Sequence, residues 1–175
     1  VGEDYVISSL RRDYRAGGND NLTFVFDTFR DRTNAFVFGM NPLGVRREAL
    51  ICNGGRDGGD FDESWDNKWQ GVSRIFPGYW TCELAIPFSS IRFKEGEKEW
   101  YFNAYRFDMQ SNTRSTWNRI PRNQSITSLA YVGRLEWEEP LRKPGAGATV
   151  IPFLTGGVTN RFMEENDEDV LVRTD

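Results

Sequence analysis

The sequence predicts an all-β protein built as an antiparallel, jelly-roll-like β-sandwich. Apolar and aromatic side chains alternate with polar ones in several short runs, which is the pattern of strands with one buried face. Aromatic residues make up 14% of the 175 residues, and the 17 glycines and 7 prolines fit a turn-rich chain. No long helix is predicted, and about seven short strands separated by turns are typical of a sandwich.

The first three strands are expected to form an antiparallel meander: Leu22 to Asp27, Ala35 to Asn41 and Val45 to Cys52. Asp27 and Asp31 flank a short charged turn between the first two strands and are expected to shape it. An Asn41-Pro42-Leu43-Gly44 turn precedes the third strand. Large apolar side chains on one face are expected to form the sandwich core: Leu22, Phe24, Phe26, Phe36 and Phe38.

A loop rich in glycine and acids is expected at residues 53–63, which hold four Gly and four Asp or Glu. Later strands are expected at Trp65 to Phe76, Tyr79 to Ile86, Trp100 to Asp108 and near Tyr131 to Leu135. Within these strands, Trp80 and Trp100 have apolar partners and are expected in the core. Cys52 and Cys82 lie in strand-like runs, and we expect two separate thiols.

The chain is expected to divide into a β-sandwich module, residues 1–139, and a following part, residues 140–175. The run from Pro140 to Gly147 is typical of a linker. Thr149 to Thr155 is expected to be an apolar strand, and Pro152 places it at an edge or outside the main sheet. Because the chain starts at Val1 rather than Met, a mature product or a fragment that lacks the first strands of its sandwich is expected.

Charge and residue usage argue against several classes of protein. The 22 Lys and Arg against 26 Asp and Glu give a net charge of −4, so no nucleic-acid partner is expected. The sequence has no histidine, and the commonest general base is therefore missing. Close carboxylates such as Asp27 with Asp31, or Asp62 with Glu63, are common on β surfaces, and we expect no enzyme. The sequence contains no run of 18 apolar residues, so no transmembrane helix is expected.

Several segments, in this order along the chain, resemble the family 9-like carbohydrate-binding module, which is a β-sandwich. They are Asp20 to Gly44, Trp80-x-x-Glu83-x-x-Ile86-Pro87-Phe88, and Ile91-Arg92-Phe93 followed by Trp100. The spacing of Trp65 and Trp69 after the Gly/Asp loop is similar as well. The resemblance covers roughly residues 5–136.

The resemblance implies a non-catalytic module that binds a glycan by aromatic stacking. Similar modules precede an outer-membrane β-barrel in bacterial envelope proteins, which implies the periplasm, the outer membrane or the cell surface of a Gram-negative-type bacterium. The segment Thr149 to Phe153 resembles the entry into the first barrel strand. The family's first strands have no counterpart before Tyr5, so an adjacent barrel segment or a partner chain is expected to complete the sheet.

Sugar binding needs a flat aromatic face with planar polar groups around it, and tryptophan is the best platform. Trp65 and Trp69 are four residues apart, so a strand would place both on one face. Trp117 lies among polar residues, where a core role is harder to justify, and we expect it to stack on the sugar together with Trp65 or Trp69. The polar residues expected at the site are Asp20, Arg106 and Arg114, although pairing with the acidic excess also explains the arginines.

Four acids of the 53–63 loop are candidate calcium ligands, because calcium takes six to eight oxygens and some members of the family carry structural calcium: Asp57, Asp60, Asp62 and Glu63. Their spacing does not match an EF-hand, and a solvated loop is the alternative. Two alternatives to glycan binding also stay open. One is a structural or interaction domain of an outer-membrane barrel protein that binds no sugar, and the other is part of a glycoside hydrolase.

Overall fold

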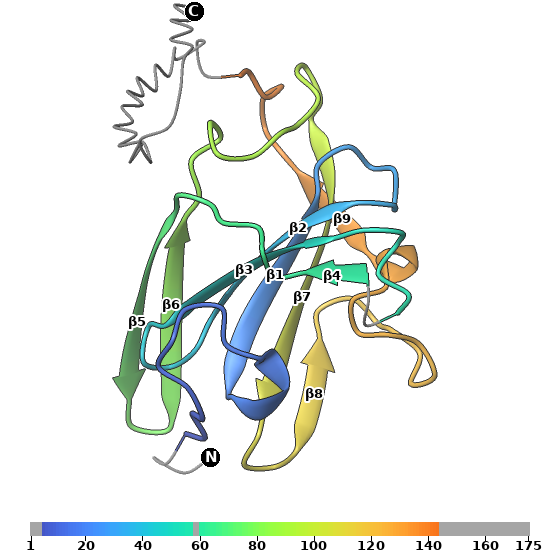
Figure 1. Ribbon diagram of the computed structural model, residues 1–175. Coiled ribbons are helices and arrows are strands. Elements are labelled where there is room, and N and C mark those ends of the chain that lie inside the picture. The colour runs from blue at the N-terminus through green and yellow to red at the C-terminus, as the bar shows by residue number, and fades with distance from the viewer. Residues whose placement is uncertain (1–4, 58–59, 144–175) are drawn as a thin grey trace, which may run out of the picture. The chain divides into compact units, whose positions relative to one another are not determined.

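The computed structural model describes residues 5–57 and 60–143 and consists mostly of antiparallel strands in two packed sheets (Figure 1). The predicted all-β sandwich is therefore confirmed. The chain divides into the units Val1–Pro144 and Gly145–Asp175, and every described residue belongs to the first. The strand expected at Thr149 to Thr155 lies outside the described residues.

The larger sheet has the order β4-β3-β2-β1-β7-β8, and β9 also pairs with β7. Its strands are β1 (Asn21–Asp27), β2 (Ala35–Met40), β3 (Arg46–Ile51), β4 (Phe61–Asp62), β7 (Glu99–Asp108), β8 (Thr113–Thr116) and β9 (Gly133–Glu136). The smaller sheet contains β5 (Gln70–Phe76) and β6 (Tyr79–Ala85). Short 3-10 helices lie at Ala16–Gly18 and Leu129–Tyr131. Within the described residues, no helix is long and apolar enough to cross a lipid bilayer.

The expected meander of β1, β2 and β3 is confirmed, and side chains fix both of its turns. The carboxylate of Asp27 accepts the N–H groups of Asp31 and Arg32 at 3.3 and 2.8 Å. Asp27 is fully buried, and this burial raises the pKa of its carboxyl group. In the second turn, Asn41 accepts two backbone N–H groups, and Gly44 takes the left-handed φ of 78° that the turn requires.

Two strand predictions differ from the structure. β5 begins at Gln70 rather than at Trp65, because residues 65–69 run as irregular chain toward the second sheet. The short strands β4 and β8 were not predicted, since two and four residues are too few to show an alternating pattern. Cys52 and Cys82 are both free thiols, as expected.

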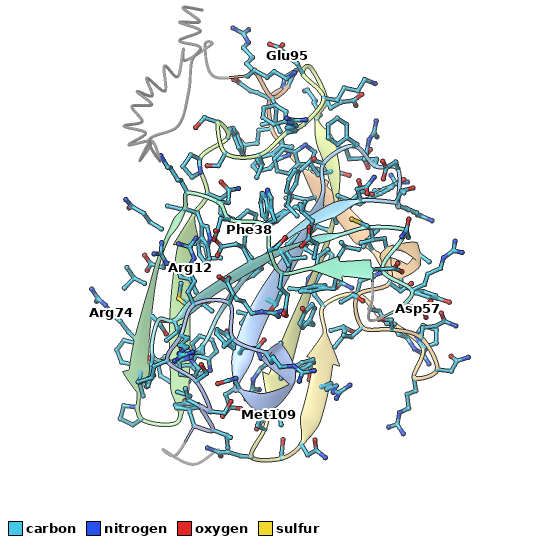
Figure 2. The ribbon with its side chains drawn as sticks, in the orientation of Figure 1. Arg12, Phe38, Asp57, Arg74, Glu95 and Met109 are labelled. Carbon is cyan, nitrogen blue, oxygen red and sulfur yellow. The ribbon has the colours of Figure 1, made fainter. Side chains whose placement is uncertain are left out.

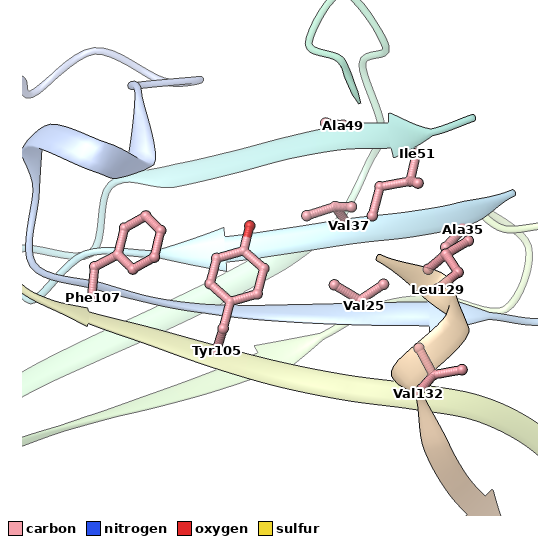
Figure 3. Close-up of a cluster of buried hydrophobic side chains, with 9 residues drawn as sticks. All are labelled: Val25, Ala35, Val37, Ala49, Ile51, Tyr105, Phe107, Leu129 and Val132. Atoms are coloured by element: carbon pink, nitrogen blue, oxygen red, sulfur yellow. The ribbon is translucent and has the colours of Figure 1, made fainter. Parts of the chain in front are cut away.

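One face of the larger sheet holds a compact apolar cluster, shown in Figure 3. Loops, and not strands, cover this cluster. Its buried members are Val25, Ala35, Val37, Ala49, Ile51, Tyr105, Phe107, Leu129 and Val132. Leu129 and Val132 come from the segment between β8 and β9 and close the cluster from outside the sheet. The residues of β1 that point toward these loops are therefore more completely buried than those that point toward the smaller sheet.

The opposite face carries the aromatic cluster between the two sheets, and Figure 2 shows Phe38 in this interior. Its buried members are Phe38, Met40, Trp69, Ile91, Phe93, Trp100 and Leu141. Trp100 is thus a core residue as expected, whereas Trp80 is only half-buried. The expected core role of Leu22 and Phe24 needs correction, because these side chains are half-buried and are not among those packed on the cluster, whereas the half-buried Phe26 and Phe36 pack against it. The smaller sheet has only two strands and covers part of their face.

The packed region extends past the expected boundary at residue 139. Leu141 is 8% exposed and belongs to the aromatic cluster. Its N–H donates to the carbonyl of Glu97 at 3.0 Å, and its own carbonyl accepts the N–H of Gly96 at 2.9 Å. The second residue of the expected linker is therefore tied to the loop before β7.

A buried carboxylate, that of Glu48 on β3, connects the larger sheet to the start of the smaller one. Glu48 is 1% exposed and forms an ion pair with Arg12. Its oxygens also accept the indole N–H of Trp69 at 3.1 Å and the backbone N–H of Asn67 at 3.2 Å. The charge is balanced and its acceptor sites are used, which a buried carboxylate requires.

We expect Glu48→Ala to destabilise the fold by about 2–3 kcal/mol, because it leaves the buried indole N–H of Trp69 and the backbone N–H of Asn67 without their acceptor. Urea unfolding followed by tryptophan fluorescence measures this change. The control is Lys94→Ala. The side chain of Lys94 is 67% exposed and forms an ion pair with Glu97. That change should cost only about 0–1 kcal/mol, and an equally small effect of Glu48→Ala would contradict the assigned role.

Candidate functional site

A hollow of about 340 Å³ lies beside Trp65 and is called the Trp65 hollow below. It is bounded by the turn after β1, by β2 and β3, and by the segment that follows β6. The lining residues that matter for its chemistry are Phe29, Asn34, Phe36, Trp65, Ser90 and Arg92.

The aromatic wall of this hollow is held rigidly. The indole of Trp65 packs on Phe36 with 5.3 Å between ring centroids and meets Phe38 edge-on at 5.8 Å. Phe29, on the turn after β1, is 50% exposed. The hydroxyl of Thr28 donates to the carbonyl of Arg92 at 2.6 Å, which ties that turn to the opposite wall. A half-buried ring fixed in this way loses little freedom when a ligand stacks on it.

The polar groups of the hollow are available for a ligand. The side chains of Asn34 and Arg92 are exposed, and within the described part of the chain neither makes a hydrogen bond or an ion pair. Both end in planar groups that can form two parallel hydrogen bonds. The hollow thus combines a fixed aromatic face with free planar polar groups.

Trp117 lies elsewhere on the same face of the larger sheet. It is 61% exposed, and its ring packs over Gly133 and meets Phe102 at 5.3 Å. Three rings in successive contact separate it from Trp65, namely Phe102, Phe26 and Phe38. The structure therefore does not bring Trp117 together with Trp65 or Trp69, and the expected pairing of these tryptophans needs correction.

Trp69 and Asp20 have structural roles. Trp69 is 3% exposed, so its ring offers no face to a sugar. Asp20 is also 3% exposed, and its carboxylate accepts the N–H groups of Val6 at 2.6 Å and Met109 at 2.7 Å. These bonds hold the N-terminal segment and the end of β7 together, which leaves Asp20 occupied.

Arg106 and Arg114 lie on opposite faces of the larger sheet and cannot serve one site. Arg114 is paired with Phe107 across β7 and β8, and its guanidinium lies 5.0 Å from that ring. Arg106 precedes Phe107 and so points to the other face, where it pairs with Asp108 at 3.0 Å. The acid-pairing interpretation therefore holds for Arg106.

Three of the four loop acids proposed as calcium ligands have separate carboxylate partners, whereas Asp57 contributes only its backbone N–H to Asp60. Asp60 accepts the N–H groups of Arg56 and Asp57 at 2.9 and 3.1 Å, and Glu63 pairs with Arg47 at 3.4 Å. Asp62 accepts both the hydroxyl and the N–H of the nearby Ser64. No group of three or more His, Cys, Asp or Glu in the described residues is arranged to hold a metal ion.

Three residues of the Trp65 hollow were not predicted: Phe29, Asn34 and Arg92. Phe29 and Asn34 sit at the two ends of the charged turn that the sequence did indicate, and an exposed Phe in such a turn was the available signal. Arg92 had no local signal, because only the fold brings residue 92 next to residue 28.

Comparisons with known proteins give no family for this chain. No protein-family model matches it, no curated protein matches it, and no solved structure matches it. The resemblance to the family 9-like carbohydrate-binding module therefore stays a prediction from the sequence.

The pKa of Asp60 provides a test of the loop structure. Hydrogen bonds from the backbone of Asp57 and the side chain of Asn53 hold this pKa below its ordinary value of 3.8. Ionised Asp60 therefore stabilises the folded loop at pH values above the ordinary pKa of 3.8. This stabilisation is lost as the pH falls through the lower pKa that Asp60 has in the folded loop. In a carboxyl NMR titration, Asn53→Ala should raise the pKa of Asp60, whereas the control Ser64→Ala should leave it unchanged.

Proposed function

We propose that this protein is a non-catalytic glycan-binding module and that the Trp65 hollow is its binding site. The observation that carries the proposal is the fixed, half-buried indole of Trp65 beside the free side chains of Asn34 and Arg92. The apolar face of a pyranose stacks on an indole, and planar amide and guanidinium groups bind pairs of neighbouring hydroxyls.

The size of the hollow supports a small sugar or the end of a glycan chain. Its volume of about 340 Å³ lies near the lower limit of pockets that enclose small molecules. Trp65 and Phe29 supply two aromatic side chains, so a ring placed between the walls has apolar contacts on more than one side. Placement in the bacterial envelope forms part of the same proposal and rests on the resemblance alone.

The lining favours binding over hydrolysis. Glycoside hydrolysis uses two carboxyl groups on either side of the scissile bond, about 5–10 Å apart. Among the described residues that line the Trp65 hollow there is no Asp or Glu. The charged group that is present, Arg92, suits a hydroxyl or an acidic sugar rather than proton transfer at neutral pH.

Titration with a panel of mono- and oligosaccharides, followed by tryptophan fluorescence, tests the proposal. A bound sugar should change the fluorescence, and Arg92→Ala and Asn34→Ala should each weaken binding by roughly tenfold, about 1.4 kcal/mol, because each removes hydrogen bonds. Both side chains are exposed, so neither change should affect folding.

Trp117→Ala is the matched control, since it removes an exposed indole outside the hollow. This variant should bind the sugar as the wild type does. No response of folded protein to any sugar of the panel would refute glycan binding. Loss of binding in Trp117→Ala, with normal binding in Arg92→Ala, would refute the location of the site.

A further inference from the structure

The strand β6 has one side on which no described strand pairs with it. β5 and β6 are joined by a two-residue turn, and hydrogen-bonded pairs alternate with non-bonded pairs along such a hairpin. Counting from the closing pair of Phe76 and Tyr79, the backbone groups of Trp80, Cys82 and Leu84 face away from β5. This row of N–H and C=O groups is an open sheet edge.

The open side of β6 lies beside an incompletely covered apolar face of the larger sheet. Leu22 and Arg106 line a hollow of about 260 Å³ together with Trp80, Cys82 and Tyr5 of the N-terminal segment, which places β6 next to β1 and β7. Farther along these strands, Phe24 and Phe102 stack with 6.4 Å between centroids and are half-buried. We call this space, above Leu22, Phe24 and Phe102 and beside β6, the strand slot.

The hairpin itself is unusually apolar for a solvent-exposed element. Ile75 is on the inner side of β5 and yet is 46% exposed, and Tyr79 is 56% exposed. A two-stranded sheet is marginally stable alone and gains from a third strand. Figure 1 shows this hairpin at one side of the described chain, with β5 outermost and β6 on the side of β1 and β7.

We propose that an extended segment of another polypeptide chain binds in the strand slot as a third strand of the smaller sheet. Only an extended peptide offers alternating donors and acceptors at about 4.8 Å from β6, so the backbone groups of Trp80, Cys82 and Leu84 select it over a sugar or a lipid. Every second side chain of the segment points into the slot and packs on Leu22 and Phe24. This site is separate from the Trp65 hollow, and the inference goes beyond glycan binding.

The floor of the slot adds a preference for charge. Arg106 lines the hollow with a side chain that is 41% exposed. Its Nη2 donates to Asp108 at 3.0 Å, and its other N–H groups can bind a carboxylate. The segment that fits best therefore has apolar residues at alternate positions and one inward acidic residue near the end of β6 next to Tyr79.

A second folded copy of the chain does not fit this slot. The open side of β6 already faces β1 and β7 of its own chain, since Leu22, Arg106 and Trp80 line one hollow. A copy that placed its β6 alongside in the same sheet would bring its own β1 and β7 into the same space. An isolated extended segment has no such obstruction.

A synthetic nonapeptide, capped at both ends, tests the proposal with the whole chain. Valine occupies its odd positions, threonine and lysine occupy the even positions, and one terminal valine is replaced by glutamate. NMR titration should move the amide signals of Trp80, Cys82 and Leu84. The same peptide with N-methyl groups on alternate residues, which removes the donors that face β6, should bind at least tenfold more weakly.

Two variants of β6 provide a matched pair. Cys82→Pro removes one N–H that faces the slot and should weaken peptide binding at least tenfold, whereas Cys82→Ala keeps this N–H and should bind as the wild type does. The N-methyl comparison on wild-type protein decides the question if Cys82→Pro fails to fold. Equal binding of both peptides, no binding at millimolar peptide, or a dimer formed through β6 would each overturn the proposal.

Discussion

The buried carboxylate of Glu48 is the constraint on which the arrangement of the two sheets depends. Its charge has lost contact with water, so the chain must keep Arg12 beside it and the donors of Asn67 and Trp69 on its oxygens. Trp69 directly precedes β5. The carboxylate therefore determines where the chain leaves the larger sheet and where the smaller sheet begins, and it fixes an indole against Phe38 at this point.

Both candidate functional surfaces follow from this anchor. β5 is held against the end of β2 and the turn that follows it. Gly71 lies so close to the methyl group of Met40 that a Cβ has no room there, and the hydroxyl of Ser73 donates to the carbonyl of Pro42 at 2.9 Å. β6 then lies toward β1 and β7 with its outer edge open. Before the anchor, the chain lays Trp65 on Phe36 and so forms one wall of the hollow.

Alternation in the sequence predicted the longer strands: β1 buries every second residue, and β6 alternates between exposed and half-buried residues. It did not predict which face of β1 is covered more completely. Phe24 is larger than Val25 and yet more exposed, since burial is decided by loops and by the width of the second sheet. The same limit applies to Trp69, whose burial depends on a carboxylate 21 residues away in sequence.

Exposure of an aromatic ring alone does not identify a sugar site, as the comparison of Trp117 with Trp65 shows. Trp117 is 61% exposed, but its ring packs on Phe102 and over Gly133, away from the Trp65 hollow. Trp65 is less exposed, but the polar side chains beside it are free. The free polar side chains beside Trp65 therefore favour the Trp65 hollow over Trp117 as the proposed sugar site.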